Sequence, residues 1–161
     1  MIDALLAQKQ LLSQLQDGSD GDPQAQPRVP REGDPATLVD FAFWVYRLQA
    51  ALLFGRLDEA LEARRRAEAC ADSARTFAES GDLPFYGALA LLALPERDPA
   101  QQAALRRDLA QLETWALACP GNFLARHELV RAERLRIDGD PAAAVEALSL
   151  IHISEPTRLL S

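Results

Sequence analysis

The fold is decided by the stretch Cys119-Pro-Gly-Asn-Phe-Leu-Ala-Arg-His-Glu-Leu-Val-Arg-Ala-Glu-Arg-Leu-Arg-Ile-Asp-Gly-Asp-Pro-Ala-Ala-Ala-Val-Glu-Ala-Leu148. Its Cys-Pro-Gly start predicts the end of one helix, and Asn122 is predicted to cap the next. Gly139 is a helix stop, and Asp140-Pro141 is typical of a new helix start. The stretch therefore predicts a helix between two tight turns, followed by the beginning of another helix.

The same signals recur along the chain with a period of 42 positions. Asp98-Pro99 precedes Asp140-Pro141 by one period, and two periods back from Gly139 is Gly55. Around Gly55, Leu-Phe-Gly-Arg-Leu-Asp-Glu-Ala-Leu resembles Ile-Asp-Gly-Asp-Pro-Ala-Ala-Ala-Val. In this comparison Ala60 matches Ala144, Leu61 matches Val145 and Ala63 matches Ala147. A period of this length, made of two helices, is typical of α-solenoids. The alternative is a plain all-α bundle in which such stops recur by chance.

The chain divides by composition. Residues 1–17 carry Ile2, Leu5, Leu6, Leu11, Leu12 and Leu15 and predict an N-terminal amphipathic helix. Residues 18–35 are rich in glycine and proline, which predicts a disordered linker. Residues 36–54 form the most hydrophobic segment, so this helix is expected at the centre of the fold and packed on most sides.

Further helices follow at recognisable start signals. One opens near Leu57 with acids in its first turn, and its run Arg64-Arg65-Arg66 is predicted to be a solvated face. Another follows a break around Ser80-Gly81-Asp82. The one that begins after Asp98 is expected to bury Leu105, Leu109, Leu112 and Ala116 on one side, with Trp115 beside them.

The amino-acid composition of the chain argues against several classes of function. The net charge of −7 argues against nucleic-acid binding, which needs a clustered positive field. No apolar run has the length of a membrane span, and no basic signal peptide precedes the first helix, so a cytoplasmic location is expected. Cys70 and Cys119 lack metal-ligand spacing and are predicted to be buried free thiols.

No catalytic or cofactor motif is apparent. A phosphate-binding loop needs glycines before its lysine, and Lys9 has none. His127-Glu128-Leu129 starts like a histidine-kinase phosphoacceptor box but continues differently, so His127 is predicted to be an exposed histidine on a polar face that it shares with Arg131 and Arg134. We therefore expect a non-enzymatic segment with no cofactor and no metal.

Residues 38–147 resemble the TPR-like helical region of large bacterial multidomain signalling proteins. Three segments carry the resemblance: Trp44 to Leu61, the helix Phe85-Tyr-Gly-Ala-Leu-Ala-Leu91, and Cys119-Pro-Gly-Asn-Phe123 followed by Leu129-Val-Arg-Ala-Glu133. The sequence departs from the family where Gly121 replaces an expected acid and Ala125 a usual histidine. In that family a serine/threonine-kinase-like domain and a predicted ATPase precede the region, and GAF and histidine-kinase modules follow it.

The resemblance implies the fold and the role. Residues 36–147 are expected to form antiparallel helix pairs stacked as a TPR-like α-solenoid, which acts as a scaffold or connector in signal transduction. Its partners would be proteins or neighbouring domains of the same parent chain, with no nucleic acid or membrane. Possible interaction anchors are Trp44, Tyr46, Tyr86 and Trp115, because aromatic side chains dominate binding hot spots; core packing is the competing interpretation. Two alternatives stay open: the sensor arm of a nucleotide-switch ATPase that activates transcription, and a free-standing helical adaptor.

Residues 148–161 differ from the rest. The string Leu-Ser-Leu-Ile-His-Ile-Ser-Glu-Pro-Thr-Arg, which ends at Arg158, resembles a translated sequencing-library adapter. We therefore expect 148–161 to be a non-native tail on a truncated fragment.

Overall fold

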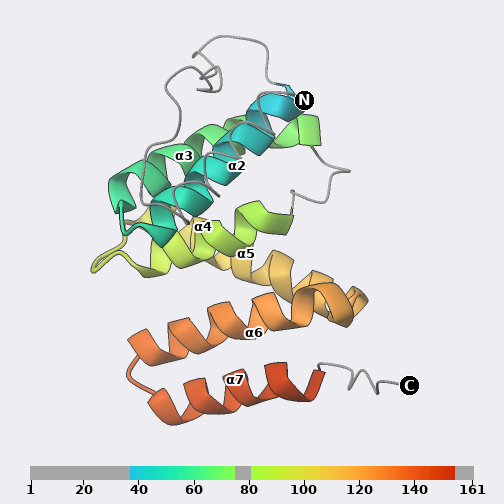
Figure 1. Cartoon of the computed structure of the whole chain (residues 1–161). Helices are drawn as coiled ribbons and strands as arrows, with labels where there is room; N and C mark the ends of the chain where they lie inside the picture. The colour runs from blue at the N-terminus through green and yellow to red at the C-terminus, as the bar shows by residue number, and fades with distance from the viewer. Residues whose placement is uncertain (1–36, 75–80, 155–161) are drawn as a thin grey trace. The chain divides into compact units, whose positions relative to one another are not determined.

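The structure is a computed structural model that describes residues 37–74 and 81–154, and these residues form helices without a β-strand. The predicted helix 1–17 and the predicted linker 18–35 lie outside the described residues. The all-α prediction is confirmed for the described residues (Figure 1). The helices are α2 (Leu38–Leu53), α3 (Leu57–Cys70), the short 3-10 helix η2 (Ala71–Ala74), α4 (Asp82–Leu92), α5 (Pro99–Ala118), α6 (Pro120–Ile137) and α7 (Pro141–Ser154).

The chain forms two compact units, and the boundary falls inside α4, between Tyr86 and Gly87. The first unit contains α2, α3 and η2, and the second contains α5, α6 and α7. Each unit is built from helices that follow one another in the sequence and pack against their neighbours.

In the first unit, α2 begins at a capping box. The Thr37 hydroxyl accepts a hydrogen bond from the backbone N–H of Asp40 at 3.2 Å, and the Asp40 carboxylate accepts one from the N–H of Thr37 at 3.0 Å. These bonds satisfy N–H groups that the first turn of a helix leaves unpaired. The helix is buried nearly all round, as its composition predicted; its buried residues are Phe41, Ala42, Phe43, Val45, Leu48, Ala50 and Ala51.

A Schellman turn joins α2 to α3. Gly55 has a φ of 69°, in the left-handed region that glycine adopts most cheaply. The N–H of Arg56 donates to the carbonyl of Ala51 at 2.8 Å, and the N–H of Gly55 donates to the carbonyl of Leu52 at 3.1 Å. The predicted helix stop at Gly55 is therefore confirmed.

Helix α3 packs on α2 through small residues. Ala60 and Ala67 are completely buried, and Ala63 is nearly so. Side chains of this size let two helices approach closely. One prediction for this helix is wrong in part: Arg65 is exposed, but Arg64 is only 4% exposed. Its guanidinium lies 2.8 Å from the Glu68 carboxylate one turn later, which compensates the buried charge.

In the second unit, α5 begins where the sequence predicted. The Asp98 carboxylate accepts a hydrogen bond from the N–H of Gln101 at 2.8 Å, and Pro99 is the first helical residue. Leu105, Leu112 and Ala116 are buried, and Leu109 is half-buried. The predicted apolar stripe is thus the packed side of α5.

An arginine terminates α4 in place of glycine. Position 97 is one period from both Gly55 and Gly139, and Arg97 stands there. Its Nη1 donates to the carbonyls of Leu91 and Leu94, each at 3.1 Å. A cation at a helix C-terminus pairs with unsatisfied carbonyls and with the negative end of the helix dipole. The Arg97 side chain therefore supplies hydrogen-bond donors to carbonyls at the end of α4, whereas the turns at Gly55 and Gly139 use backbone N–H groups.

The turn between α5 and α6 differs from the prediction. Helix α5 ends at Ala118 as expected, but the N-cap of α6 is Cys119 and not Asn122. Pro120 occupies the first helical position, where its fixed φ fits and its missing N–H costs nothing. Asn122 therefore already lies inside the helix, and its backbone N–H donates to the Cys119 carbonyl at 3.1 Å.

Helix α6 packs against both α5 and α7, and it runs alongside α7 (Figure 1). A Schellman turn links α6 to α7: Gly139 has a φ of 88°, and the N–H of Asp140 donates to the carbonyl of Leu135 at 2.9 Å. Asp140 then caps α7 by accepting from the N–H of Ala143 at 3.0 Å. The contact between the two helices is a cluster of Ala132, Ala144 and Ala147, with Leu135 against it.

Helix α7 continues to Ser154 and so crosses the predicted boundary at Leu148 without a break. Val145 is 67% exposed, whereas Ala144 and Ala147 beside it are buried. Ala144 and Ala147 therefore face α6, and Val145 does not.

Candidate interaction surface

The four predicted anchors divide between the two units. Trp44 and Tyr46 lie on α2 and Tyr86 lies in the part of α4 that belongs to the first unit; Trp115 lies on α5 in the second unit. All four are half-buried, so each has both a packed part and a part that meets solvent. The prediction that at least two of them line one groove stays a prediction.

Trp44 lies where α2 meets α3. Its indole ring meets the Phe43 ring edge to face at 5.0 Å, and the Arg66 guanidinium of α3 lies 5.6 Å from the ring centre. A guanidinium over an indole face is attracted by the negative charge of the ring surface. The half-buried Trp44 ring therefore has the Arg66 cation over its face.

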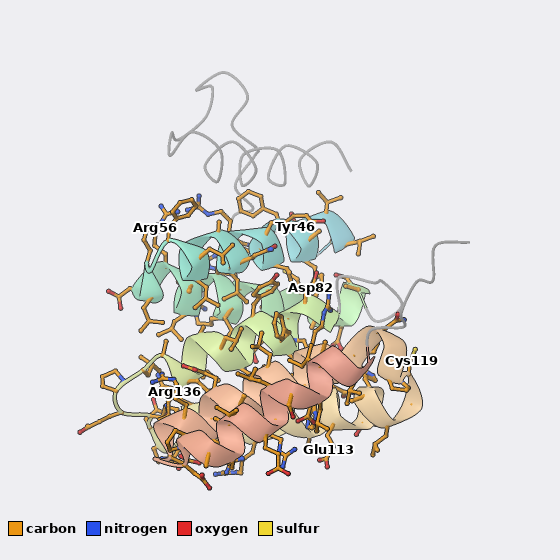
Figure 2. All side chains as sticks on the ribbon, turned by 60° about the horizontal axis from the view of Figure 1, so that its bottom comes forward. Tyr46, Arg56, Asp82, Glu113, Cys119 and Arg136 are labelled. Carbon is orange, nitrogen blue, oxygen red and sulfur yellow. The ribbon has the colours of Figure 1, made fainter. Side chains whose placement is uncertain are left out.

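Tyr86 is connected to α2 by a hydrogen bond. Its hydroxyl accepts from the Gln49 side-chain amide at 2.8 Å, and its ring packs edge to face on Phe85 at 4.9 Å. Tyr46 precedes Gln49 by three residues and so lies on the same side of α2, whereas Trp44 lies nearly opposite Tyr46 because each residue turns the helix by about 100°. Tyr46 is labelled in Figure 2. The geometry thus groups Tyr46 with Tyr86 and separates Trp44 from them.

Trp115 lies in the last turn of α5, next to the junction with α6. Its ring lies 5.2 Å from that of Phe123, and the Arg126 guanidinium lies 5.9 Å from the Phe123 ring. Leu117, two residues further, is 81% exposed. Figure 2 shows Cys119 of this junction and Arg136 at opposite ends of α6. The junction combines aromatic, aliphatic and cationic side chains at the surface.

A group of ion pairs, formed by Glu59 and Glu62 with nearby arginines, lies next to Trp44. The Glu59 carboxylate lies 3.5 Å from Arg47 of α2 and 3.5 Å from Arg56 of the turn. Glu62 accepts hydrogen bonds from Arg65 and Arg66, at 2.8 Å from each, and these bonds lower its pKa to about 2. Arg66 therefore joins the Glu62 carboxylate to the Trp44 ring.

A buried carboxylate that sequence reasoning did not single out lies in α6. Glu128 is 4% exposed, and its two oxygens lie 3.0 Å from His127 Nδ1 and 3.1 Å from Arg131 Nη1. The exposed histidine predicted at position 127 is wrong, since only 17% of its side chain is exposed. Burial of this side of α6 depends on the neighbouring helices, and the local pattern of charges gives no sign of it.

The two cysteines differ. Cys70, at the end of α3, is buried, and burial together with the nearby Asp40 carboxylate raises the pKa of its thiol. Cys119 is exposed, which contradicts the prediction of two buried thiols. Cys119 is the single non-helical residue between α5 and α6, at the junction where the chain reverses, and is not part of the packed face of either helix.

Among residues 37–74 and 81–154, no group of three or more histidine, cysteine, aspartate or glutamate residues is arranged to hold a metal ion. Within these same ranges no helix has both the length and the apolar character to cross a membrane. The comparisons add no relative: no family model, curated protein or solved structure matches the chain.

Proposed function

We propose that this chain is a non-catalytic helical-repeat scaffold, a connector segment of a bacterial signal-transduction protein that mediates contacts between domains or proteins. The observation that carries the proposal is the recurrence of one junction. Gly55 and Gly139 end their helices with equivalent Schellman bonds, and each is followed by a helix that presents two buried alanines, Ala60 and Ala63 in one and Ala144 and Ala147 in the other. Such helix pairs are the building blocks of α-solenoids, whose extended surfaces bind other proteins.

The resemblance to bacterial signalling proteins supplies the setting. In those proteins the helical region lies between an ATPase half and a sensor-kinase half. The half-buried aromatics suit contact with a neighbouring domain, because each combines a packed ring with an exposed edge. Trp44 with Arg66, and Trp115 with Phe123, are the two places where we expect such contacts.

The connector role is tested by long-read sequencing of the parent gene across the codon for Ala147. The proposal predicts that the reading frame continues into further helix pairs and then into sensor or kinase modules, and that ATPase motifs precede residue 1. A genuine stop after Ser161 contradicts the connector role and favours a free-standing adaptor. A following DNA-binding module would instead favour the sensor arm of a transcriptional activator.

The non-catalytic part has its own test. The purified chain, incubated with radiolabelled ATP and Mg²⁺, is expected neither to hydrolyse the nucleotide nor to acquire label. Acid-labile label that disappears in His127→Ala and persists in an Arg131→Ala control would overturn this part of the proposal. His127 is the appropriate residue to examine because its imidazole already contacts the Glu128 carboxylate.

A further inference from the structure

The end of the α2–α3 pair carries a small group of charges, formed by Arg47 and Arg56 around Glu59. Arg47 Nη2 and Arg56 Nη1 each lie 3.5 Å from the same oxygen of Glu59, Oε2, and all three side chains are partly exposed. Arg56 lies in the turn itself (Figure 2). We call these three residues the arginine cluster. It sets two guanidiniums against one carboxylate, and so it is positively charged on a chain whose net charge is −7.

The contacts within the arginine cluster are long compared with those of the next glutamate along α3. Glu62 accepts from Arg65 at 2.8 and 2.9 Å and from Arg66 at 2.8 Å. Both ion pairs at Glu59 are longer, at 3.5 Å, than the usual charge-assisted hydrogen bond. Arg56 Nε is buried and has no hydrogen-bond partner among the described residues. The cluster therefore keeps hydrogen-bonding capacity that Glu59 does not use.

Apolar side chains adjoin the arginine cluster. Leu53 is 55% exposed and Phe54 is 40% exposed, and the Arg56 guanidinium lies 5.6 Å from the centre of the Phe54 ring. Arg47 follows Trp44 by three residues, so these two side chains lie on the same side of α2. Arginine and aromatic side chains are enriched at the centres of protein interfaces. The end of α2 thus combines unused cationic donors with exposed apolar surface.

We propose that the arginine cluster, together with Leu53 and Phe54, binds an acidic protein segment in which a carboxylate lies next to an apolar side chain. The carboxylate of the partner accepts hydrogen bonds from a guanidinium, whose planar fork matches its two oxygens. The apolar side chain packs on Phe54. The inference rests on the proposed scaffold function, and it extends the contact expected at Trp44 to the neighbouring turn.

The charges of the cluster favour this class of partner over two others. Two arginines against one glutamate attract an anion and repel a basic segment. Nucleic acid requires a larger positive field than the cluster provides. Asp58, the acid that precedes Glu59, lies about 100° further round α3 and so does not share its direction. An acidic protein segment is therefore the partner whose charge and apolar content both match this surface.

Glu59 acts as a competitor built into this surface. A bound carboxylate draws guanidinium donors away from Glu59, because both acids approach the same two arginines. Loss of the Glu59 charge is therefore expected to strengthen binding, whereas loss of either arginine weakens it. A cluster that only stabilises the turn predicts no gain of binding from Glu59→Gln. The direction of this change separates a binding surface from a purely structural group.

The test begins with selection of phage-displayed random peptides on the immobilised full chain. Enriched peptides are expected to carry Asp or Glu next to Leu, Ile or Phe. One such peptide, synthesised with a fluorescent label, then gives a Kd by fluorescence anisotropy. Arg47→Gln and Arg56→Gln are each expected to raise this Kd about ten-fold, the value of a charge-assisted hydrogen bond. Glu59→Gln is expected to lower it about three-fold, as for an exposed ion pair.

Arg106→Gln is the matched control, because it removes the same charge from an exposed position on α5. It is expected to leave the Kd unchanged, and an equal loss in this variant overturns the proposal by showing attraction to charge in general. Selection that enriches nothing, or enriches peptides without an acid, also overturns it. So does tighter binding of a labelled single-stranded oligonucleotide than of the peptide.

Circular dichroism of each variant confirms that the helices are intact. If Arg56→Gln loses helix, the opposite changes expected from Arg47→Gln and Glu59→Gln still decide the matter. The peptide measurements are also independent of the gene sequence that tests the connector role. A parent gene without kinase or ATPase modules contradicts that role but leaves peptide binding intact, whereas failed peptide binding leaves the connector role intact.

Discussion

Gly55 and Gly139 hold the same left-handed conformation and end α2 and α6 with the same two types of hydrogen bond. At both glycines an added Cβ would meet nothing within 4 Å, so space does not explain the residue. The backbone conformation explains why glycine stands at these positions, because L-residues with a side chain adopt a positive φ only at a cost of about 1 kcal/mol.

Gly139→Ala is therefore expected to lower the free energy of unfolding by about 1 kcal/mol, through backbone strain alone. The measurement is urea denaturation followed by circular dichroism. Gly121→Ala is the control, because Gly121 lies in the first turn of α6, is not among the glycines with positive φ, and has equal space around it. It should leave stability unchanged or raise it by up to about 1 kcal/mol. Equal losses in both variants would show that strain at position 139 is not the cause.

The core of the second unit can be probed by one substitution at two positions of α5. Leu112 is completely buried and Leu117 is 81% exposed. Leu112→Ala is expected to cost about 2–5 kcal/mol because it removes buried methyl groups and leaves a cavity. Leu117→Ala is expected to change stability by less than about 0.5 kcal/mol. Thermal unfolding of both variants measures the difference, and similar losses would contradict the placement of α5.

Arg97 is expected to stabilise the end of α4. Arg97→Met keeps the aliphatic stem but removes the donors to the Leu91 and Leu94 carbonyls. We expect a loss of about 1 kcal/mol, the usual net value of such hydrogen bonds. Arg106→Met, an exposed position on α5, is the control and should have little effect. If both variants unfold at the same urea concentration as the unaltered chain, the arginine cap contributes nothing.

The thiols give a test of local structure without a substitution. In the native chain, Cys119 is expected to react with iodoacetamide quickly and Cys70 only after unfolding, since Cys70 is buried and its pKa is raised by that burial and by Asp40. Mass spectrometry of peptides after timed labelling measures both rates. Comparable labelling of the two cysteines would mean that the end of α3 opens readily.

The lowered pKa of Glu62 predicts that the protein loses stability as the pH falls. Its pKa is lowered to about 2 by Arg65 and Arg66, below the value of about 4.3 in an unfolded chain. The contribution of Glu62 to the free energy of unfolding is therefore complete above a pH of about 4.3, and it disappears as the pH falls toward 2. Because the carboxylate is largely exposed, we expect less than about 1 kcal/mol. Glu62→Gln should remove this part of the acid dependence, and identical pH profiles for both proteins would contradict it.

Local signals in the sequence predicted much of this fold. The caps at Asp98 and Asp140 and the stops at Gly55 and Gly139 depend on a few neighbouring residues, and all four are confirmed. The start of α6 was misplaced because two local signals competed, and proline at position 120 fits the first turn better than asparagine fits the cap.

Burial of charge was not predictable in the same way. Arg64 stands in a run of three arginines that looks solvated, and its burial follows from the packing of α3 against its neighbours. Glu128 is likewise buried within α6. The aromatic anchors were recognisable by residue type, but which of them share a side of α2 follows only from helix geometry and from the bond between Gln49 and Tyr86.

The most direct test of the helix-pair account is a solution NMR structure of the chain. A solenoid predicts positive φ angles at Gly55 and Gly139, slow amide exchange at Arg56 and Asp140, and nuclear Overhauser contacts only between helices that are neighbours in the array. Contacts between side chains of α2 and α7 around one shared core would contradict the repeat and show a closed helical bundle.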